Sequence, residues 1–400
     1  MREVGALLSI EEAQRLILER VRPLEPEPVA LDSAAGRVLV EPARARVDLP
    51  PFDSSAMDGF ALRSSDTPGR LPVRERIPAG KPAGRSLEPG EAMGIATGGA
   101  VPEGADAVIQ LEAVVDSGNE IEIANSVAVG ANVRPRGGDI RLGDVVVEAG
   151  DLLGAAQIGA LAAAGVPEVS CSRRPRAALL ATGTELRRPG EQLEPGQIYE
   201  ANSALLAAQM RSAGAEVELL EAVEDDEAAH RAALEAGLRG DVLVTSGGVS
   251  VGPHDLVRSV GADLGVEEVL WGVAVKPGKP LWFGVRDETL VFGLPGNPVS
   301  CLVGFEIFVR PALLALQGAT SPLPRFDPGR LARAVRPNPA RTELMRARSA
   351  VVDSVVELDV VTGQDSHMIA RAAGADALVL IPSGTDELPA GAVVSYLRLA

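Results

Sequence analysis

The sequence is poor in cysteine, in aromatic residues and in positive charge. Two cysteines in 400 residues, Cys171 and Cys301, cannot form a disulfide framework or a cysteine-rich zinc site, and such usage is typical of a reducing compartment. Aromatic residues make up 3% of the chain, too few for the stacking platforms that bind single-stranded nucleic acid. With 38 basic and 55 acidic residues the formal net charge is −17, which repels a phosphate backbone. Neither a disulfide-stapled secreted protein nor a nucleic-acid-binding protein is expected.

Long apolar runs are also missing. The longest, residues 152–166, is interrupted by glycines and is shorter than the roughly 20 residues that span a bilayer. The first residues lack the charged start, apolar stretch and small-residue cleavage site of a signal peptide. With 46% apolar residues the chain can bury a sizeable core, and its length predicts two to three domains at roughly 150 residues each. We expect a cytoplasmic protein with no membrane partner.

Hydrophobic periodicity divides the chain into parts. The first is helical, because Ser9 and Glu12 have capping-box spacing ahead of an apolar helical stripe. Short β-branched runs cut by glycine and proline follow, between about residues 47 and 147. From residue 176 strands and helices alternate, which is typical of a mostly parallel sheet covered on both faces. Asn202 or Ser203 is expected to cap one of these helices, and after residue 322 only strands are indicated.

These patterns predict an α/β multidomain protein. The expected parts are N-terminal helical segments at residues 1–46 and 146–175, a β-rich domain at 47–145, an α/β domain at 176–322 and a C-terminal β domain at 323–400. Ligands of open α/β sheets bind outside the carboxyl ends of the strands, so the loops at that edge are the first place to look for chemistry.

A glycine-rich loop at residues 245–252 (TSGGVSVG) gives the strongest chemical signal. It follows an apolar strand directly, and Gly247 and Gly248 let backbone amides approach an anion while Ser246 adds a hydroxyl. Asp255 lies just beyond and is a candidate Mg²⁺ ligand, because hard cations take carboxylate and phosphate oxygens together. The structural alternatives are a plain glycine turn and an acidic residue that favours a helix N-terminus.

Three further loops end strands of the same predicted sheet. Lys276 and Lys279 share a proline-stiffened turn, which is costly unless an anion or water offsets their charges. The segment at residues 293–298 opens a helix whose free amides can hold a phosphate, a plain cap being the alternative. The segment at 182–185 adds Glu185 as a metal ligand or base. Because such loops meet at one edge, we infer a pocket for a phosphorylated or nucleotide-like ligand.

Other signals are weaker. Residues 51–61 place aspartates and serines between two phenylalanines, a pattern that turn chemistry alone can explain. The stretch from Arg325 to Arg348 holds seven arginines and is either a solvated face or an anion-attracting rim. The three histidines show no metal-ligand spacing, and His230 is assigned to a solvated helix face.

Seven of these segments occur together, in order, in a known family. They are residues 51–61 (PFDSSAMDGFA), 97–107 (TGGAVPEGADA), 136–140 (RGGDI), 182–186 (TGTEL), 245–252 (TSGGVSVG), 276–280 (KPGKP) and 293–300 (GLPGNPVS). From about residue 7 to residue 400 the chain resembles the molybdopterin molybdenumtransferases, the MoeA family, also found as the E domain of gephyrin.

The resemblance implies a fold and a reaction. The family subunit has a mixed linker domain, an inserted β-rich domain, a three-layer α/β/α molybdopterin-binding domain and a C-terminal β-barrel-like domain, and it forms an elongated homodimer. The implied reaction converts adenylylated molybdopterin and molybdate, with Mg²⁺ or another divalent cation, to molybdenum cofactor and AMP. Proteins that make the cofactor or mature molybdoenzymes are implied as further partners.

Carried over motif by motif, the resemblance assigns roles to individual residues. The catalytic group would be Asp58, Thr97 and Asp139, reaching the cleft from the other subunit, with Lys276 and Lys279. The ligand-binding group would be Thr182, Gly183, Ser246, Gly247, Gly248, Ser250, Pro295, Gly296, Asn297, Arg346 and Ser366. The metal ligands would be Glu185, Asp226 and Asp255. The match is loosest around Arg346 and Ser366, where Asp365 replaces the family's usual glycine.

Two other functions stay open at this point. The chain could catalyse the preceding adenylyltransferase step, because that enzyme shares the α/β domain, although it would not need the inserted and C-terminal domains. It could also be a non-catalytic scaffold of the gephyrin type. A scaffold would not need Asp58, Asp139, Glu185 and Asp255 together.

Overall fold

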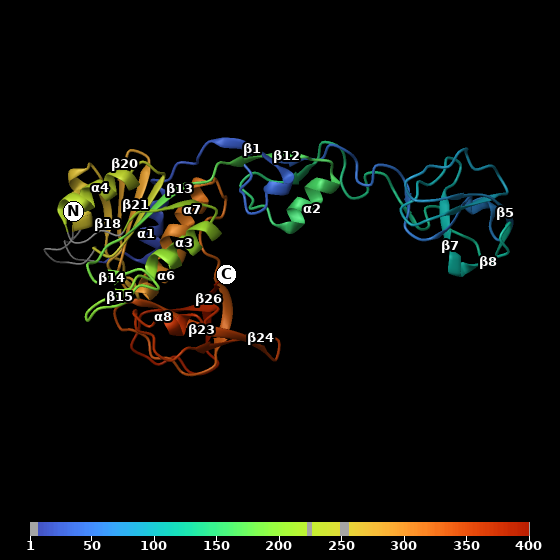
Figure 1. Ribbon diagram of the computed structural model, residues 1–400. Coiled ribbons are helices and arrows are strands. Elements are labelled where there is room, and N and C mark those ends of the chain that lie inside the picture. The colour runs from blue at the N-terminus through green and yellow to red at the C-terminus, as the bar shows by residue number, and fades with distance from the viewer. Residues whose placement is uncertain (1–6, 222–225, 249–255, 400) are drawn as a thin grey trace.

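The computed structural model describes residues 7–221, 226–248 and 256–399, and the molecule is elongated (Figure 1). The α/β domain and the C-terminal domain lie together at one end, a slender linker leads away from them, and the inserted β-rich domain forms the far end (Figure 1). The multidomain α/β architecture expected from the sequence is confirmed.

The α/β domain is built on a six-stranded sheet of order β16-β13-β17-β21-β20-β18. The first four strands are parallel, and β20 and β18 continue the sheet antiparallel. Their bounds are β13 (Arg176–Ala181), β16 (Glu216–Leu219), β17 (Val242–Ser246), β18 (Glu267–Trp271), β20 (Trp282–Arg286) and β21 (Thr289–Leu294).

Helices cover both faces of this sheet, as the alternation of strands and helices predicts. In β13, Ala177 and Leu179 face one core while Ala178 and Leu180 face the other, which is the period of two expected for a strand buried on both sides. The first core takes α1 (Ile10–Leu18), α3 (Asn202–Ser212), α6 (Pro298–Gly304) and α7 (Arg310–Leu316), and the second takes α4 (Glu227–Gly237) and α5 (Leu256–Asp263).

The first helix forms as predicted but packs elsewhere than expected. The Ser9 hydroxyl accepts from the Glu12 amide while the Glu12 carboxylate accepts from the Ser9 amide, which completes the capping box. Its buried apolar side chains, Ile10, Ala13 and Ile17, belong to the α/β core and not to the linker. An amphipathic pattern shows that one helix face is buried, but it does not show which surface covers that face.

The helix from Pro298 to Leu316 is the most apolar in the part of the chain that the structure describes. A π-helical segment, Phe305–Val309, joins α6 to α7 without a break. Among the described residues this is the one helix long and apolar enough to cross a membrane, and 78% of it is buried inside the protein.

The linker and the inserted domain are made of short strands. In the linker, β1 (Pro26–Ala30) pairs with β12 (Glu168–Ser172), β2 (Ala43–Arg44) pairs with β11 (Val145–Val147), and α2 (Ala155–Ala163) packs beside them. The inserted domain holds a six-stranded sheet of order β7-β4-β6-β5-β9-β8 and a small pair formed by β3 (Ser54–Ser55) and β10 (Val133–Arg134). The six strands are β4 (Gly59–Leu62), β5 (Gly69–Ile77), β6 (Ala92–Ile95), β7 (Ala107–Gln110), β8 (Val114–Asp116) and β9 (Glu120–Ile123).

The C-terminal domain is a closed barrel with one strand added from the α/β domain. The order is β19-β23-β24-β22-β26-β25, and a pairing between β25 and β23 closes the ring. The members are β19 (Val275–Lys276), β22 (Asp327–Leu331), β23 (Thr342–Val352), β24 (Val355–Val360), β25 (Ala377–Ile381) and β26 (Val393–Arg398), with α8 (Ile369–Ala372) between β24 and β25. Because β19 pairs with β23, one sheet crosses the boundary between the two domains.

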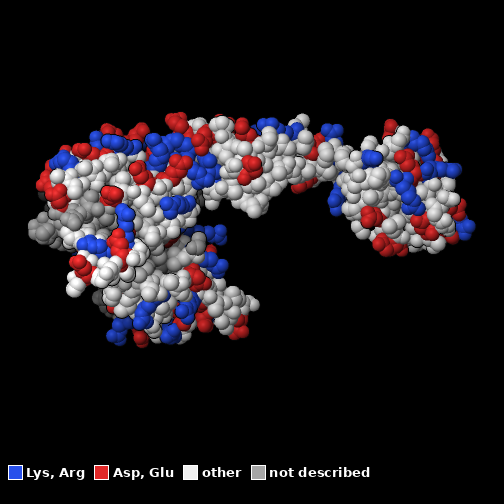
Figure 2. Space-filling model, viewed as in Figure 1, with Lys and Arg blue, Asp and Glu red and all other residues white. Residues whose placement is uncertain are grey.

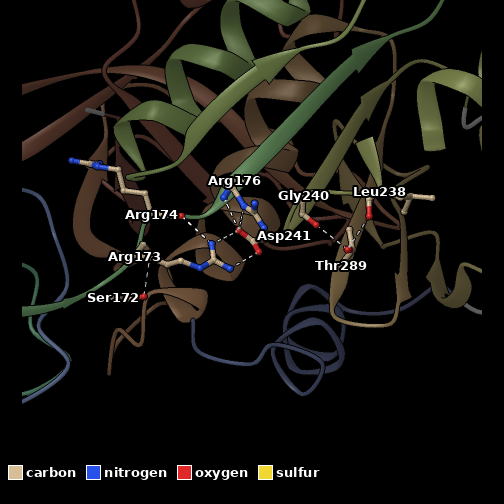
Figure 3. Close-up of polar contacts among 8 residues, drawn as sticks. All are labelled: Ser172, Arg173, Arg174, Arg176, Leu238, Gly240, Asp241 and Thr289. Atoms are coloured by element: carbon tan, nitrogen blue, oxygen red, sulfur yellow. Dashed lines mark hydrogen bonds and ion pairs between the residues drawn. The ribbon is translucent and has the colours of Figure 1, made fainter. Parts of the chain in front are cut away.

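A partly buried ion pair joins the linker to the α/β domain (Figure 3). Asp241, just before β17, accepts from both terminal nitrogens of Arg173, at 2.6 and 2.7 Å, and from the Arg176 amide at 2.7 Å. Burial raises the pKa of Asp241, but these hydrogen bonds outweigh burial and hold the pKa below its ordinary value. The carboxylate is therefore charged at neutral pH and holds the chain where it enters the domain.

Candidate functional site

The loops that follow β13, β17 and β21 meet at one edge of the sheet. We call this edge, formed by residues 182–185, 246–248 and 295–297, the mouth. The Thr182 amide donates to the Ser246 carbonyl, and the Gly247 amide donates to the Leu294 carbonyl, each at 3.0 Å. The three predicted loops are therefore neighbours in the folded chain.

Glycine is required at two positions of the mouth. Gly247 and Gly248 have φ angles of +94° and +67°, which side chains of L-amino acids rarely adopt. A Cβ on Gly247 would lie 2.7 Å from the Thr182 carbonyl oxygen, and one on Gly248 would lie 2.8 Å from the Val257 side chain. The glycine pair therefore lets two loops pack at backbone distance.

Asn202 joins two loops of the mouth and was not recognised as a site residue in the sequence. It lies in the first turn of α3, whose N-cap is Ala201, so the expected capping role is wrong. Its Nδ2 donates to the Ser246 hydroxyl and to the Gly296 carbonyl, both at 2.7 Å. An asparagine near a helix start has the same sequence pattern whether it caps the helix or holds a distant loop.

Ser246 belongs to the mouth by its backbone, but its side chain is buried and packs against Cys301. Ser246 is 2% exposed, and its Oγ is 3.6 Å from the Cys301 sulfur. The Cys301 thiol donates to the Pro295 carbonyl at 2.9 Å, and burial raises the pKa of Cys301 to about 12. As it lies here, the Ser246 hydroxyl contacts protein groups, so it supports the loop from below instead of facing an open ligand site.

Residues 276–280, which we call the lysine loop, begin in a strand that pairs with the C-terminal domain. Lys276 and Glu343 are opposite each other in the β19–β23 pairing, and Lys276 Nζ lies 2.6 Å from Oε1 of the buried Glu343. Lys279 is exposed and has no ion-pair partner in residues 7–221, 226–248 and 256–399. Of the three lysines in the whole chain, two are in this loop, and the third is Lys81. This bias was a usable signal in the sequence.

The C-terminal domain reaches the mouth through Ser366. The Ser366 carbonyl accepts from the Val299 amide at 3.0 Å and so occupies one of the free amides at the start of α6. Asn297 is the N-cap of α6, but its side chain makes no capping hydrogen bond. The helix start is thus shared between domains, and the Asn297 side chain is not committed to the helix.

Arg346 lies inside the C-terminal domain. Its side chain has no exposed surface, and its nitrogens donate to the carbonyls of Met368, Gly363 and Asp365 and to the Gln364 side chain. Burial lowers the pKa of Arg346 from its ordinary value. The expectation of direct ligand contact is revised for this reason: in this structure Arg346 shapes the segment that carries Ser366.

Asp58, Thr97 and Asp139, which we call the acidic group, belong to the inserted domain. That domain lies far from the mouth of the same chain (Figure 1). The Thr97 amide and hydroxyl donate to the Asp58 carboxylate at 2.6 and 2.9 Å, and these bonds lower the pKa of Asp58. Asp139, where the inserted domain meets the linker, is exposed and its carboxylate has no partner among the described residues. One chain alone does not bring these residues to the mouth.

The described carboxylates do not assemble a metal site. Glu185 is exposed beside Gly183, whereas Asp226 caps α4 through the Ala229 amide. No group of three or more potential ligands occurs in residues 7–221, 226–248 and 256–399. Asp255 and Ser250 lie outside the described residues. Of the three predicted metal ligands, Glu185 is the one that the structure describes and whose carboxylate makes no hydrogen bond to a described residue.

His230 corrects one further expectation. It is 1% exposed, and its Nδ1 lies 3.0 Å from the Asp226 carbonyl, so it packs inside the domain and not on a solvated face.

A cavity of about 810 Å³ lies beside the mouth, at the carboxyl ends of β13 and β16. Charged residues of both signs alternate on its wall with leucines, so it can take a ligand that is part polar and part apolar. Its lining is Leu186, Arg187, Arg188, Pro189, Glu191, Glu200, Ser203, Ala204, Leu219, Leu220 and Glu221.

Three family regions together match nearly the whole chain. Residues 8–165 match the MoeA N-terminal region (domain I and II), residues 178–315 match a family described as "probable molybdopterin binding domain", and residues 328–399 match the MoeA C-terminal region (domain IV).

Named relatives and solved structures agree with these matches. Molybdopterin molybdenumtransferase 2 of Mycobacterium tuberculosis is 37% identical over 399 residues, covering 96% of this chain and 97% of the relative. The molybdopterin molybdenumtransferase of Staphylococcus epidermidis is 30% identical, with 98% and 95% covered. A molybdopterin biosynthesis MoeA protein of Pyrococcus horikoshii superposes with a TM-score of 0.84 at 29% identity, over 98% of this chain and all of that one, and a second structure gives 0.79 at 32%, over 98% and 99%. Because three family regions and relatives of 30–37% identity match nearly its whole length, the chain belongs to the MoeA family of molybdopterin molybdenumtransferases.

Proposed function

We propose that this protein inserts molybdate into adenylylated molybdopterin and releases AMP, completing the molybdenum cofactor in the cytoplasm. The observation that carries the proposal is the convergence of the loops after β13, β17 and β21 at one sheet edge. The lysine loop and Ser366 both reach the start of α6 beside this edge: a Cβ on Gly278 would lie 3.8 Å from the Ser300 carbonyl oxygen, and the Ser366 carbonyl accepts from the Val299 amide. Splitting a phosphoric anhydride and binding a tetrahedral dianion both place negative charge on oxygen. Fixed amides, hydroxyls and ammonium groups stabilise that charge.

The choice of lysine supports this reading. The chain has 38 basic residues, and only three are lysine, so arginine serves almost everywhere that positive charge is needed. A lysine ammonium is a compact point charge with three donors, whereas a guanidinium is a broad planar fork. Two lysines in one stiff loop suit a small oxyanion, because a compact ammonium group matches its size better than a broad guanidinium does.

A divalent cation remains part of the proposal. Mg²⁺ takes oxygen ligands and keeps several waters, so Glu185 and substrate phosphate oxygens could hold it together with Asp255. The cation would offset charge on the phosphates.

Dimerisation would bring the acidic group to the mouth. The nine residues of α2 are all uncharged, yet only Leu161 is buried, and nearby Leu152 is 53% exposed. The linker shows a largely uncharged lower face (Figure 2). A second copy that covers this face would allow Asp58 and Asp139 of one subunit to approach the lysine loop of the other.

The test is AMP release from adenylylated molybdopterin with molybdate and Mg²⁺. Asp58→Ala and Lys279→Ala should stop it, because the first removes a carboxylate of the acidic group and the second removes an ammonium group that has no ion-pair partner among the described residues. Lys81→Ala removes the one lysine outside the loop and should leave the rate unchanged.

The outcomes separate the functions. Undiminished AMP release in both site variants would contradict the assigned roles. ATP turnover on metal-free molybdopterin would indicate the adenylyltransferase instead. Tight partner-protein binding without any pterin binding would indicate a scaffold. Light scattering that shows a monomer would contradict the dimer.

A further inference from the structure

One amide side chain beneath the mouth holds two of its loops together. Asn202 Nδ2 donates to the Ser246 hydroxyl and to the Gly296 carbonyl, both at 2.7 Å. A carbonyl can only accept, so the amide nitrogen must face Gly296, and the orientation of the side chain is determined. Helix α3 therefore ties the loop after β17 to the loop after β21.

This orientation has a cost. Asn202 Oδ1 is buried and has no hydrogen-bond partner among the described residues. Buried amide oxygens are almost always paired in native proteins, and an exception needs a specific reason. Here the exception lets both amide protons bond to the mouth loops. The stabilisation from holding these loops together offsets the cost of the unpaired oxygen.

The contact extends into a chain of donors. Ser246 Oγ accepts from Asn202, and its own proton can turn toward the Cys301 sulfur at 3.6 Å. The Cys301 thiol donates to the Pro295 carbonyl at 2.9 Å, next to Gly296. This series of hydrogen bonds therefore begins at Asn202 and ends at Pro295, in the same loop that Asn202 contacts through Gly296. Such linked hydrogen bonds rigidify the groups they join.

We propose that Asn202 is a positioning residue for anion binding: it sets the spacing between the Gly247–Gly248 turn and the Pro295–Asn297 turn. A Cβ on Gly296 would lie 3.7 Å from the Gly247 Cα, so the two turns are already in backbone contact, and a small shift would change every amide they present. The inference rests on the proposed function, because that function supplies the phosphate-bearing ligand.

The chain offers a matched control in Gln317. This amide is 1% exposed, and its Nε2 also donates to two backbone carbonyls, those of Ala213 and Leu313, both at 2.9 Å. It lies near the start of β16, at the opposite end of the strands from the mouth. Replacing either amide by leucine removes two hydrogen bonds at similar volume.

The experiment compares Asn202→Leu with Gln317→Leu. Binding of AMP is measured by equilibrium dialysis, and kcat and KM are measured for AMP release from adenylylated molybdopterin. We expect Asn202→Leu to bind AMP about tenfold more weakly, the effect of losing two neutral hydrogen bonds, and to raise KM more than it lowers kcat. Gln317→Leu should unfold as easily as Asn202→Leu but keep wild-type AMP affinity.

The failures are distinguishable. Wild-type protein that neither binds nor releases AMP overturns the proposed function. Wild-type activity with unchanged AMP affinity in Asn202→Leu, or an equal loss in Gln317→Leu, overturns the positioning role alone.

A second variant tests the donor itself. Asn202→Asp keeps the shape but sets a carboxylate oxygen against the Gly296 carbonyl, and protonation turns one oxygen back into a donor. The AMP affinity of Asn202→Asp relative to wild type should therefore rise as pH falls from about 8 to about 5. A ratio that does not change with pH contradicts the inference.

Discussion

Removing the Asp241 carboxylate should destabilise the α/β domain where the linker enters it. Its carboxylate accepts three hydrogen bonds, two of them from the Arg173 guanidinium, and its side chain is 11% exposed. Breaking a buried ion pair costs about 3–5 kcal/mol, but Arg173 is 30% exposed and water can solvate it again. We therefore expect Asp241→Ala to lower the free energy of unfolding of the α/β domain by about 2–4 kcal/mol.

Tryptophan fluorescence in a urea titration measures this directly. The two tryptophans of the chain, Trp271 and Trp282, both lie in the α/β sheet, so their signal reports the domain that Asp241 anchors. Asp263→Ala is the control, because Asp263 is 62% exposed in its ion pair with Arg231 and such pairs contribute at most about 1 kcal/mol. Equal midpoints for the two variants would refute the reasoning.

The same pair predicts a pH dependence. The folded pKa of Asp241 is lowered, so its contribution is complete above about pH 4, the ordinary value for an unfolded aspartate, and is lost as pH falls through the lower folded value. The stability difference between wild type and Asp241→Ala should stay constant from about pH 8 to pH 5 and shrink only in stronger acid. A difference that shrinks between pH 8 and pH 5 would show that another group is responsible.

Three further outcomes follow from the contacts described above. Lys276→Met leaves the buried Glu343 carboxylate unpaired and should destabilise the protein by about 1–3 kcal/mol in urea titrations, and adding Glu343→Gln should recover most of that loss. The Cys301 thiol, with its pKa raised to about 12, should not react with Ellman's reagent at about pH 8 until denaturant is added; fast native labelling of this residue would contradict its burial. Gly59→Ala would place a Cβ 1.9 Å from the Ile109 carbonyl oxygen, so the inserted domain should lose its cooperative unfolding transition in circular dichroism, and a normal transition would show that the strands can separate there.

The sequence predicts local structure well where one residue pattern has one physical outcome. The capping box at Ser9 and Glu12 formed as expected, because both partners lie within four residues of each other. The strand-to-helix alternation after residue 176 produced the three-layer domain, because a sheet buried on both faces needs apolar residues at every position of its inner strands.

The sequence could not predict which groups a polar side chain contacts. Arg346 stands among exposed arginines in the chain, yet four acceptors from a later loop enclose it. Ser246 was expected in the ligand site and proved to be buried, while Asn202, 44 positions earlier, turned out to hold it. Such contacts depend on tertiary packing, which periodicity does not encode.

The pairing of β19 with β23 has a consequence for any attempt to dissect the protein. An excised fragment that ended before the barrel would keep Lys276 and Lys279 in its sequence but would lose the strand that stretches their turn and the carboxylate that neutralises Lys276. A fragment without the C-terminal barrel should therefore fold its sheet, but the loop that carries the two ammonium groups should no longer be held in one position. The position of the two lysines therefore depends on both domains together, and neither domain alone fixes it.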